Sequence, residues 1–209
     1  MIDKIVDKIM IRARAKMPEV DDERAEVIAF GLNILIGEIP KLILLFGLSW
    51  ILGILKYTVI SFLIISPYRK FSGGIHLKTH LGCIVGTTIF FCGTAYMSKI
   101  INFGSFNIKL VVAVLVWIIS IIFISIYAPA DTENIPILRK KDRKFNRALS
   151  YILVTAMVIT SFFVKDRIIS NMFIIGTLMQ SLTICRLTYN IFKVKYGYLE
   201  YIKTQKDAI

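Results

Sequence analysis

Long apolar runs separated by short polar segments dominate the chain from residue 27 onward. A helix needs roughly 20 apolar residues to cross a bilayer, and several runs have that length. The pattern therefore predicts an all-α membrane protein with about six transmembrane helices joined by short loops. The predicted spans are residues 27–47, 48–67, 81–101, 108–127, 148–164 and 168–192.

The first two spans come from one stretch, Val27 to Pro67, which is about twice as long as a single crossing requires. We expect a tight reversal near Gly47 to Trp50. Glu38 and Lys41 interrupt the first half, and their spacing of three residues lets them pair inside a helix bundle. Interrupted or re-entrant helices are the alternative, because Pro40 can kink a helix.

The first 20 residues have the pattern of an amphipathic helix, with apolar positions at helical spacing and lysines or arginines on the other faces. Such a helix lies on the membrane surface or packs against the protein's own cytoplasmic side, and the pattern fits both. Asp21 or Asp22 is a suitable cap for the helix that follows. The charges in this segment exclude the uninterrupted apolar core of a signal peptide.

Composition supports a single membrane domain over residues 1–209, because 56% of the residues are hydrophobic and the mean hydropathy is +0.69. The net charge of +12 comes from basic residues between the apolar runs. Nineteen lysines and arginines fall on the side of the two termini and four on the other, so the positive-inside rule predicts cytoplasmic termini. These short basic blocks suit membrane lipids, and we expect no nucleic acid as a partner.

The polar stretch from Arg69 to Cys83 contains both histidines of the chain and one of its three cysteines. Gly73 and Gly74 permit a turn or the close approach of another backbone segment. Cys83 is expected at the start of the third span, where a helix N-terminus and nearby cations stabilise a thiolate. The stretch is therefore the candidate catalytic segment.

Two histidines compete to be the base that a cysteine nucleophile needs. His80 is three residues from Cys83 and can contact it on a helix. His76 is seven residues away, about 10 Å along a regular helix, and can reach Cys83 only if Gly73 to Thr79 form a loop. Helical geometry alone favours His80.

Other interpretations of these residues remain open. His76, His80 and Cys83 have a spacing that suits three zinc ligands, although no carboxylate stands beside them. The plainer alternative is two polar residues at a membrane interface and a packed thiol. Cys92 and Cys185 lie within apolar runs and indicate neither disulfides nor a zinc ribbon.

The loop from Tyr127 to Ile137 contains two prolines, which favour an extended chain, and a basic run from Arg139 to Arg147 follows it. This surface could receive an acidic peptide or anionic headgroups. A solvated loop on the positive side of the membrane is the alternative for any single basic residue.

These residues together resemble the accessory gene regulator B family of bacterial membrane endopeptidases, which process precursors of quorum-sensing peptides. The resemblance rests on Arg69, Gly73-Gly74, His76 and Cys83 at the family spacing, and on the Tyr-Ala-Pro-Ala sequence that begins at Tyr127. It extends over nearly the whole chain in its pattern of spans. The glycine, histidine and cysteine pattern inside a polytopic protein is fairly specific.

The resemblance implies a cysteine peptidase in which Cys83 attacks a peptide bond of a short precursor and His76 acts as base and then acid. An acidic C-terminal segment leaves, and the acyl-enzyme thioester is resolved into a thiolactone or lactone. Arg69 then becomes a candidate for holding the substrate carboxylate or the oxyanion. The other residues assigned to the substrate site are Gly73, Gly74, Arg139, Lys140 and Lys141.

This assignment carries further expectations. It implies neither a cofactor nor a metal, and it places a multi-pass protein in the bacterial cell membrane with its catalytic loop on the cytoplasmic side. Gly82 and Gly86 form a small-residue face that would suit helix packing or a homodimer. The alternative function is a non-catalytic exporter or scaffold that binds an acidic partner through its basic loops.

Overall fold

A computed structural model describes residues 2–16, 21–77, 79–133 and 136–207. Over these residues the regular structure is helical, with a single isolated β-bridge. The helices are α1 (Ile2–Lys16), α2 (Asp22–Ile51), α3 (Leu55–Ser72), α4 (His80–Ile100), α5 (Phe106–Tyr127), α6 (Lys140–Phe163), α7 (Arg167–Ile184), α8 (Arg186–Ile191) and α9 (Gly197–Asp207).

Among the described residues, five helical segments are long and apolar enough to cross a membrane. They belong to α2, α4, α5, α6 and α7. Many large apolar side chains point outward from them, among them Trp50, Leu115 and Phe163, as expected for a surface that faces lipid rather than water. The predicted all-α membrane fold is confirmed.

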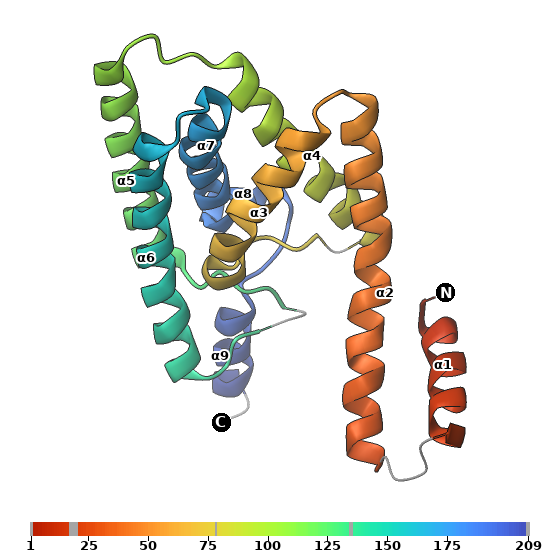
Figure 1. Ribbon diagram of the computed structural model, residues 1–209. Helices are drawn as coiled ribbons and strands as arrows, with labels where there is room; N and C mark the ends of the chain where they lie inside the picture. Colours follow the sequence, from red (N-terminus) through yellow and green to blue (C-terminus); the bar gives the residue numbers. More distant parts are fainter. Residues whose placement is uncertain (1, 17–20, 78, 134–135, 208–209) are drawn as a thin grey trace.

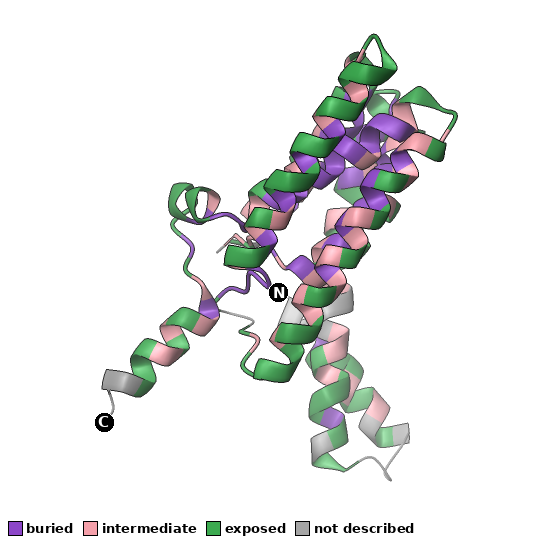
Figure 2. Ribbon diagram, turned by 90° about the vertical axis from the view of Figure 1, so that its left-hand side faces the viewer, coloured by how far each residue is buried: buried purple, intermediate pink, exposed green. Residues whose placement is uncertain are grey.

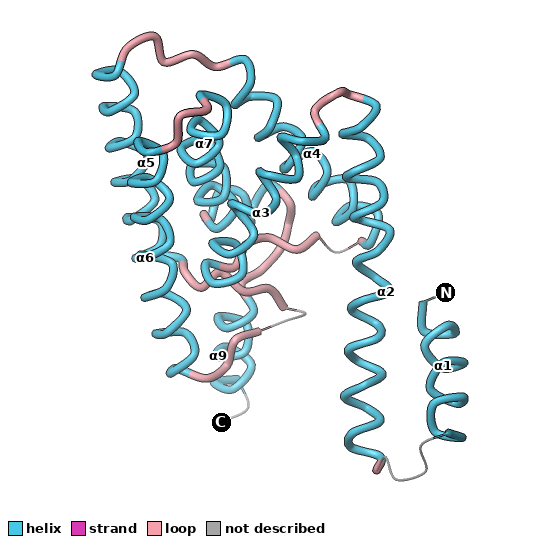
Figure 3. Tube along the Cα trace, viewed as in Figure 1, coloured by secondary structure: helices cyan, strands magenta, loops and turns pink. Residues whose placement is uncertain are grey.

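Helix α7 lies at the centre of the bundle, where α3, α4, α5 and α6 pack around it (Figure 1). More than half of its positions are buried, and Figure 2 shows the buried positions in the interior, with exposed positions on outer faces. Figure 3 shows that the loops gather at two ends of the bundle. The 73–77, 128–133 and 136–139 segments share one end, and the 101–105 and 164–166 segments share the other.

The reversal after the first long helix comes later than the sequence suggested. Helix α2 continues to Ile51, past the expected turn at Gly47 to Trp50. The chain turns at Gly53 instead, whose φ of +66° is a left-handed conformation that suits glycine at the end of a helix. Helix α3 occupies the second predicted span, but its basic residues exclude it from the five segments above.

Several local predictions for the first two helices are confirmed. The side chain of Asp21 accepts a hydrogen bond from the amide of Arg24 and so caps α2. Glu38 and Lys41 form an ion pair on α2. Helix α1 packs on α2 with Val6 buried, while Ile9 and Ile11 stay exposed; its contact with a membrane surface remains a prediction. Residues 17–20, which include Pro18, lie outside the described residues.

The last predicted span, residues 168–192, is divided in the structure. Helix α7 ends at Ile184, Cys185 is extended, and the short α8 follows. The side chain of Thr188 donates to the carbonyl of Leu182 at 2.6 Å, which satisfies one of the carbonyls left free where α7 ends. Arg186, directly after the break, favours the membrane interface over its interior.

A backbone pairing between two distant segments fixes the end of α3. The amide of Gly74 donates to the carbonyl of Ala130 at 2.9 Å, and the amide of Ala130 donates to the carbonyl of Ser72 at 2.8 Å. Gly73 and Gly74 have φ values of +75° and +147°, which side-chain-bearing residues rarely adopt. The predicted close approach of another backbone at this glycine pair is confirmed.

Replacing Gly73 with alanine should destabilise the protein by about 1–3 kcal/mol or more, since the new Cβ would overlap the carbonyl of Ala130 at a strained φ. Thermal unfolding in detergent micelles measures the effect. Gly53→Ala is the matched control, because Gly53 also has a positive φ but has open space around it. Equal losses in the two variants would show that backbone strain, and not the pairing with Ala130, explains the requirement for glycine.

Candidate active site

Cys83 lies in the first turn of α4, as the sequence predicted. The Thr79 side chain caps this helix by accepting from the amide of Gly82, and the amide of Cys83 bonds the Thr79 carbonyl at 3.0 Å. The thiol is half-buried, whereas Cys92 and Cys185 are buried. This position places the thiol at the positive end of the α4 dipole.

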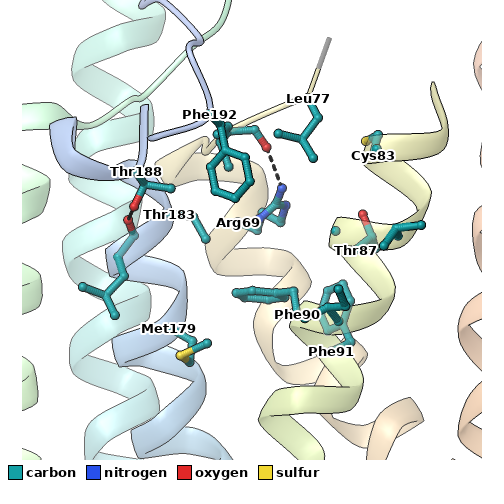
Figure 4. A pocket seen from close by; sticks show the side chains of 16 residues that line it. Arg69, Leu77, Cys83, Thr87, Phe90, Phe91, Met179, Thr183, Thr188 and Phe192 are labelled. Carbon is teal, nitrogen blue, oxygen red and sulfur yellow. Dashed lines mark hydrogen bonds between the residues drawn. The ribbon is translucent and has the colours of Figure 1, made fainter. Parts of the chain in front are cut away.

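Arg69 extends from the last turn of α3 toward the loop that leads to α4 (Figure 4). Its guanidinium donates to the carbonyl of Ile75 at 3.0 Å and to Oε1 of Gln180 at 3.3 Å, and it stacks on the ring of Phe90 at 5.5 Å. These contacts with the 73–77 loop, α7 and α4 hold the Arg69 side chain in place on the wall of the cavity that Cys83 also lines.

Cys83 and Arg69 line one cavity of about 480 Å³ between α3, α4 and α7 (Figure 4). Its other walls are mainly apolar and include Phe90, Phe91 and Met179. Such a cavity holds apolar groups and leaves few partners for water. His76 is not among the lining residues.

His76 lies in the loop from Gly73 to Thr79, which is not helical where the structure describes it. His76 can reach Cys83 only if the helix is broken before α4, and the structure has this break. The side chain is exposed at the surface, but surrounding protein still desolvates it enough to lower its pKa, and the charges of Arg69 and Lys41 lower it further. This favours the neutral, proton-accepting form at neutral pH.

The segment around His76 is pinned to α4 by Leu77. A Cβ on Gly82 or Gly86 would lie 3.4 or 3.3 Å from Cδ1 of Leu77, so the small-residue face receives this side chain. Leu77 of the same chain packs on this face, and the expected homodimer remains a prediction. The contact keeps the His76 loop against the first turns of α4.

The role of His80 stays open. His80 is the first residue of α4, but its side chain lies outside the part of the structure that is described. Among the described residues no group of three metal-binding side chains comes together. The zinc interpretation depends on His80, so it remains a prediction.

Gln180 is a site residue that sequence reasoning missed. It is fully buried on α7, and its amide nitrogen donates to the carbonyl of Gly73 at 2.8 Å and to Oγ of Ser72 at 3.0 Å. Its amide oxygen accepts from Arg69. A glutamine inside an apolar, membrane-depth helix is itself a functional signal, and that signal was available in the sequence.

The loop after α5 is a packed structural element rather than an open binding segment. Asp131 is buried and pairs with Arg143 at 3.0 Å, and Arg143 also donates to the carbonyl of Pro129. Arg147 donates to the carbonyl of Ala128 at 2.7 Å. Two residues of the basic run therefore hold the segment that pairs with Gly73.

Three other basic residues of this run make none of these bonds to the loop. Arg139, Lys140 and Lys141 are exposed where α6 begins. They lie at the same end of the bundle as the Gly73 turn (Figure 1). Contact between these three residues and a substrate remains a prediction.

The fold and the site define a class: an all-α, multi-pass membrane protein with a cysteine at a helix start beside an apolar cavity. The sequence model of accessory gene regulator B matches residues 2–184, and the chain belongs to that family. Membership supports a role in the processing of quorum-sensing peptides. The matched region includes the whole candidate site and ends where α7 ends.

Relatives from several bacteria resemble the chain along most of its length. It is 25% identical to an AgrB-like protein of Clostridium acetobutylicum, over 85% of this chain and 83% of the relative. It is 25% identical to one of Listeria monocytogenes, over 93% and 91%. The accessory gene regulator protein B of Staphylococcus epidermidis is 26% identical, over 81% and 84%. No solved structure matches the chain.

Removing the positive charge of Lys41 should raise the pKa of His76. Lys41→Gln eliminates a charge that lowers this pKa and leaves Glu38, which raises it. A titration of the histidine ring signals by NMR, with His80→Gln to assign them, measures the shift. Lys99→Gln, at the other end of the bundle, should leave the titration unchanged; a similar shift in both variants would contradict the proximity of Lys41 and His76.

Proposed function

We propose that this chain is a membrane-embedded cysteine endopeptidase that removes the C-terminal segment of a short signal-peptide precursor and supports its cyclisation. The observation that carries the proposal is the position of Cys83, in the first turn of α4 and on the wall of an apolar cavity that it shares with Arg69. Family membership supplies the context of quorum-sensing peptide processing.

The proposed reaction has two acyl transfers. The Cys83 thiolate attacks the scissile carbonyl, the carbon–nitrogen bond breaks, and the leaving amine takes a proton. A cysteine or serine within the precursor then attacks the thioester, and Cys83 departs as the ring closes. No oxidant or reductant is needed, because each step exchanges one acyl bond for another.

His76 is proposed as the base that takes the thiol proton and then delivers it to the leaving amine. Its neutral form at neutral pH suits the first step. The Gly73 turn and the contact of Leu77 with α4 keep its loop near Cys83. A modest movement of this loop would bring the imidazole to the thiol when substrate binds.

Arg69 is proposed to stabilise the oxyanion or to hold a substrate carboxylate. Its planar fork of donors suits either role, and its bonds to Ile75 and Gln180 orient it before substrate arrives. The cavity would take the acyl part of the substrate, and its apolar walls would disfavour water.

The acidic leaving segment is proposed to contact the exposed Arg139, Lys140 and Lys141. These residues are proposed to face the cytoplasm together with the catalytic loop, because the basic residues of the chain gather at this end. The precursor is thereby held at the membrane surface with its cleavage site near Cys83.

Cys83→Ala should abolish cleavage while leaving the protein folded in the membrane. The measurement is cleavage, in membranes or micelles, of a short precursor with an amphipathic helix, a cysteine or serine, and an acidic tail. Denaturing mass spectrometry of the wild type should show Cys83 carrying the precursor without its tail. Cys92→Ala is the control, because Cys92 is buried between helices and does not line the cavity.

The alternative function makes the opposite prediction in the same experiment. A scaffold or exporter would handle the peptide normally after Cys83→Ala and His76→Ala. It would fail after neutralisation of Arg139, Lys140 and Lys141. Cleavage that persists in Cys83→Ala would therefore remove the peptidase proposal.

Gln180→Leu should reduce the rate of cleavage by about 10²-fold, because it releases Arg69 and the carbonyl of Gly73 from their fixed positions. Single-turnover cleavage kinetics measure the loss. Asn171→Leu is the matched control: it removes a buried amide from the same helix, one that bonds the carbonyls of Ser98 and Ile101 away from the site. If both variants lose the same activity, the effect of Gln180 is on general stability.

A further inference from the structure

A second hollow lies at the end of the bundle opposite Cys83. It has a volume of about 250 Å³ and is formed by the α4–α5 loop, the start of α5 and the α6–α7 link. Both connecting segments lie at the upper end of the bundle in Figure 1. Unlike the cavity beside Cys83, it is lined largely by polar groups, including Asn102, Ser105 and Asn171.

The positive charge at this end is concentrated around the hollow. Three of the cationic side chains at this end, Lys109, Lys165 and Arg167, line the hollow, whereas Lys56 and Lys99 do not. No acidic residue is among its lining residues, all of which the structure describes. Asp166 is adjacent, but its Oδ1 already accepts from the first amides of α7.

Part of this positive charge neutralises nearby helix ends. Arg167 donates to the carbonyls of Ile101 and Lys99, where α4 ends. Lys109 donates to the carbonyl of Ser161, near the end of α6, and to Oγ of Ser170. These bonds use two donors of each residue and therefore hold the two cations in place around the hollow.

The three cationic side chains keep hydrogen-bond donors that a ligand could use. A guanidinium has five N–H donors and an ammonium three, so Arg167 and Lys109 each keep some free. Lys165 is exposed and has no hydrogen bond or ion pair among the described residues. Helix α5 also begins at this hollow and adds a positive dipole end, whereas the carboxylate of Asp166 already caps α7.

We propose that this hollow binds a phosphate group at the membrane surface, either in the headgroup of an anionic phospholipid or as a free ion. Three cations with spare donors, one from α5 and two from the α6–α7 link and the start of α7, together with the N-terminus of α5, match a tetrahedral anion. A phosphate group needs only part of the volume, which leaves room for the rest of a headgroup. The site is independent of the peptidase proposal, because it lies at the other end of the bundle.

The test compares Lys165→Ala with Lys99→Ala in the full chain purified in detergent. Both variants remove one positive charge from the same end, but only Lys165 lines the hollow. Binding of phosphatidylglycerol, phosphatidylcholine and inorganic phosphate is measured by native mass spectrometry and by thermal stabilisation. Lys165→Ala should weaken binding of phosphatidylglycerol or of inorganic phosphate about fivefold, and Lys99→Ala should leave it unchanged; the zwitterionic phosphatidylcholine should bind more weakly than phosphatidylglycerol.

The ligands distinguish the two sources of phosphate. A selective loss of phosphatidylglycerol binding in Lys165→Ala identifies a lipid headgroup, and a selective loss of inorganic phosphate binding identifies a free ion. Equal weakening by both variants would mean that general surface charge explains the binding, and the proposed site would be rejected. Equal affinity of the wild type for phosphatidylcholine and phosphatidylglycerol, without phosphate binding, would reject it as well.

Discussion

The pairing of the Gly73 turn with Ala130 is the constraint on which the arrangement of the candidate site depends. Two backbone hydrogen bonds join the end of α3 to the loop after α5, and they form only because no side chain fills the space at Gly73. The turn ends α3 three residues after Arg69 and leads the chain across to α4. Two segments that are far apart in the sequence therefore form one structural unit, and Arg143 and Arg147 hold its second half.

Helix α7 extends this constraint through the centre of the bundle. Gln180 bonds the carbonyl of Gly73, and Ser181 bonds the hydroxyls of Tyr68 and Ser120. Polar groups in an apolar interior are costly unless they are paired, so these bonds are made to specific partners and disfavour sliding of the helices. The end of α3 is thus held by two sets of bonds, namely the backbone pairing with Ala130 and the side-chain bonds from α7.

Much of this arrangement could be predicted from local sequence, because local chemistry decides it. Helical runs, the start of α4 shortly before Cys83 and the close approach at Gly73 depend on residues near each feature. The exact turn at Gly53 depended on which of several glycines takes a positive φ, and helix periodicity does not distinguish them. Gln180 and Arg143 act on residues distant in the sequence, and only the folded chain shows which carbonyls they reach.

The proposed chemistry depends on which nucleophile attacks the thioester on Cys83, and the geometry of the site influences that choice. A thioester on Cys83 can be attacked by water or by a nucleophile of its own acyl chain. Well-oriented intramolecular attack has effective molarities of about 10⁵–10⁸ M, which exceeds what any solvent provides, so ring closure wins if the acyl chain is held in a bent conformation. The apolar cavity favours this result twice, because it gives the chain a surface to fold against and gives water few partners. Arg69, already bonded to the protein, supplies charge without the reorganisation that mobile water would require.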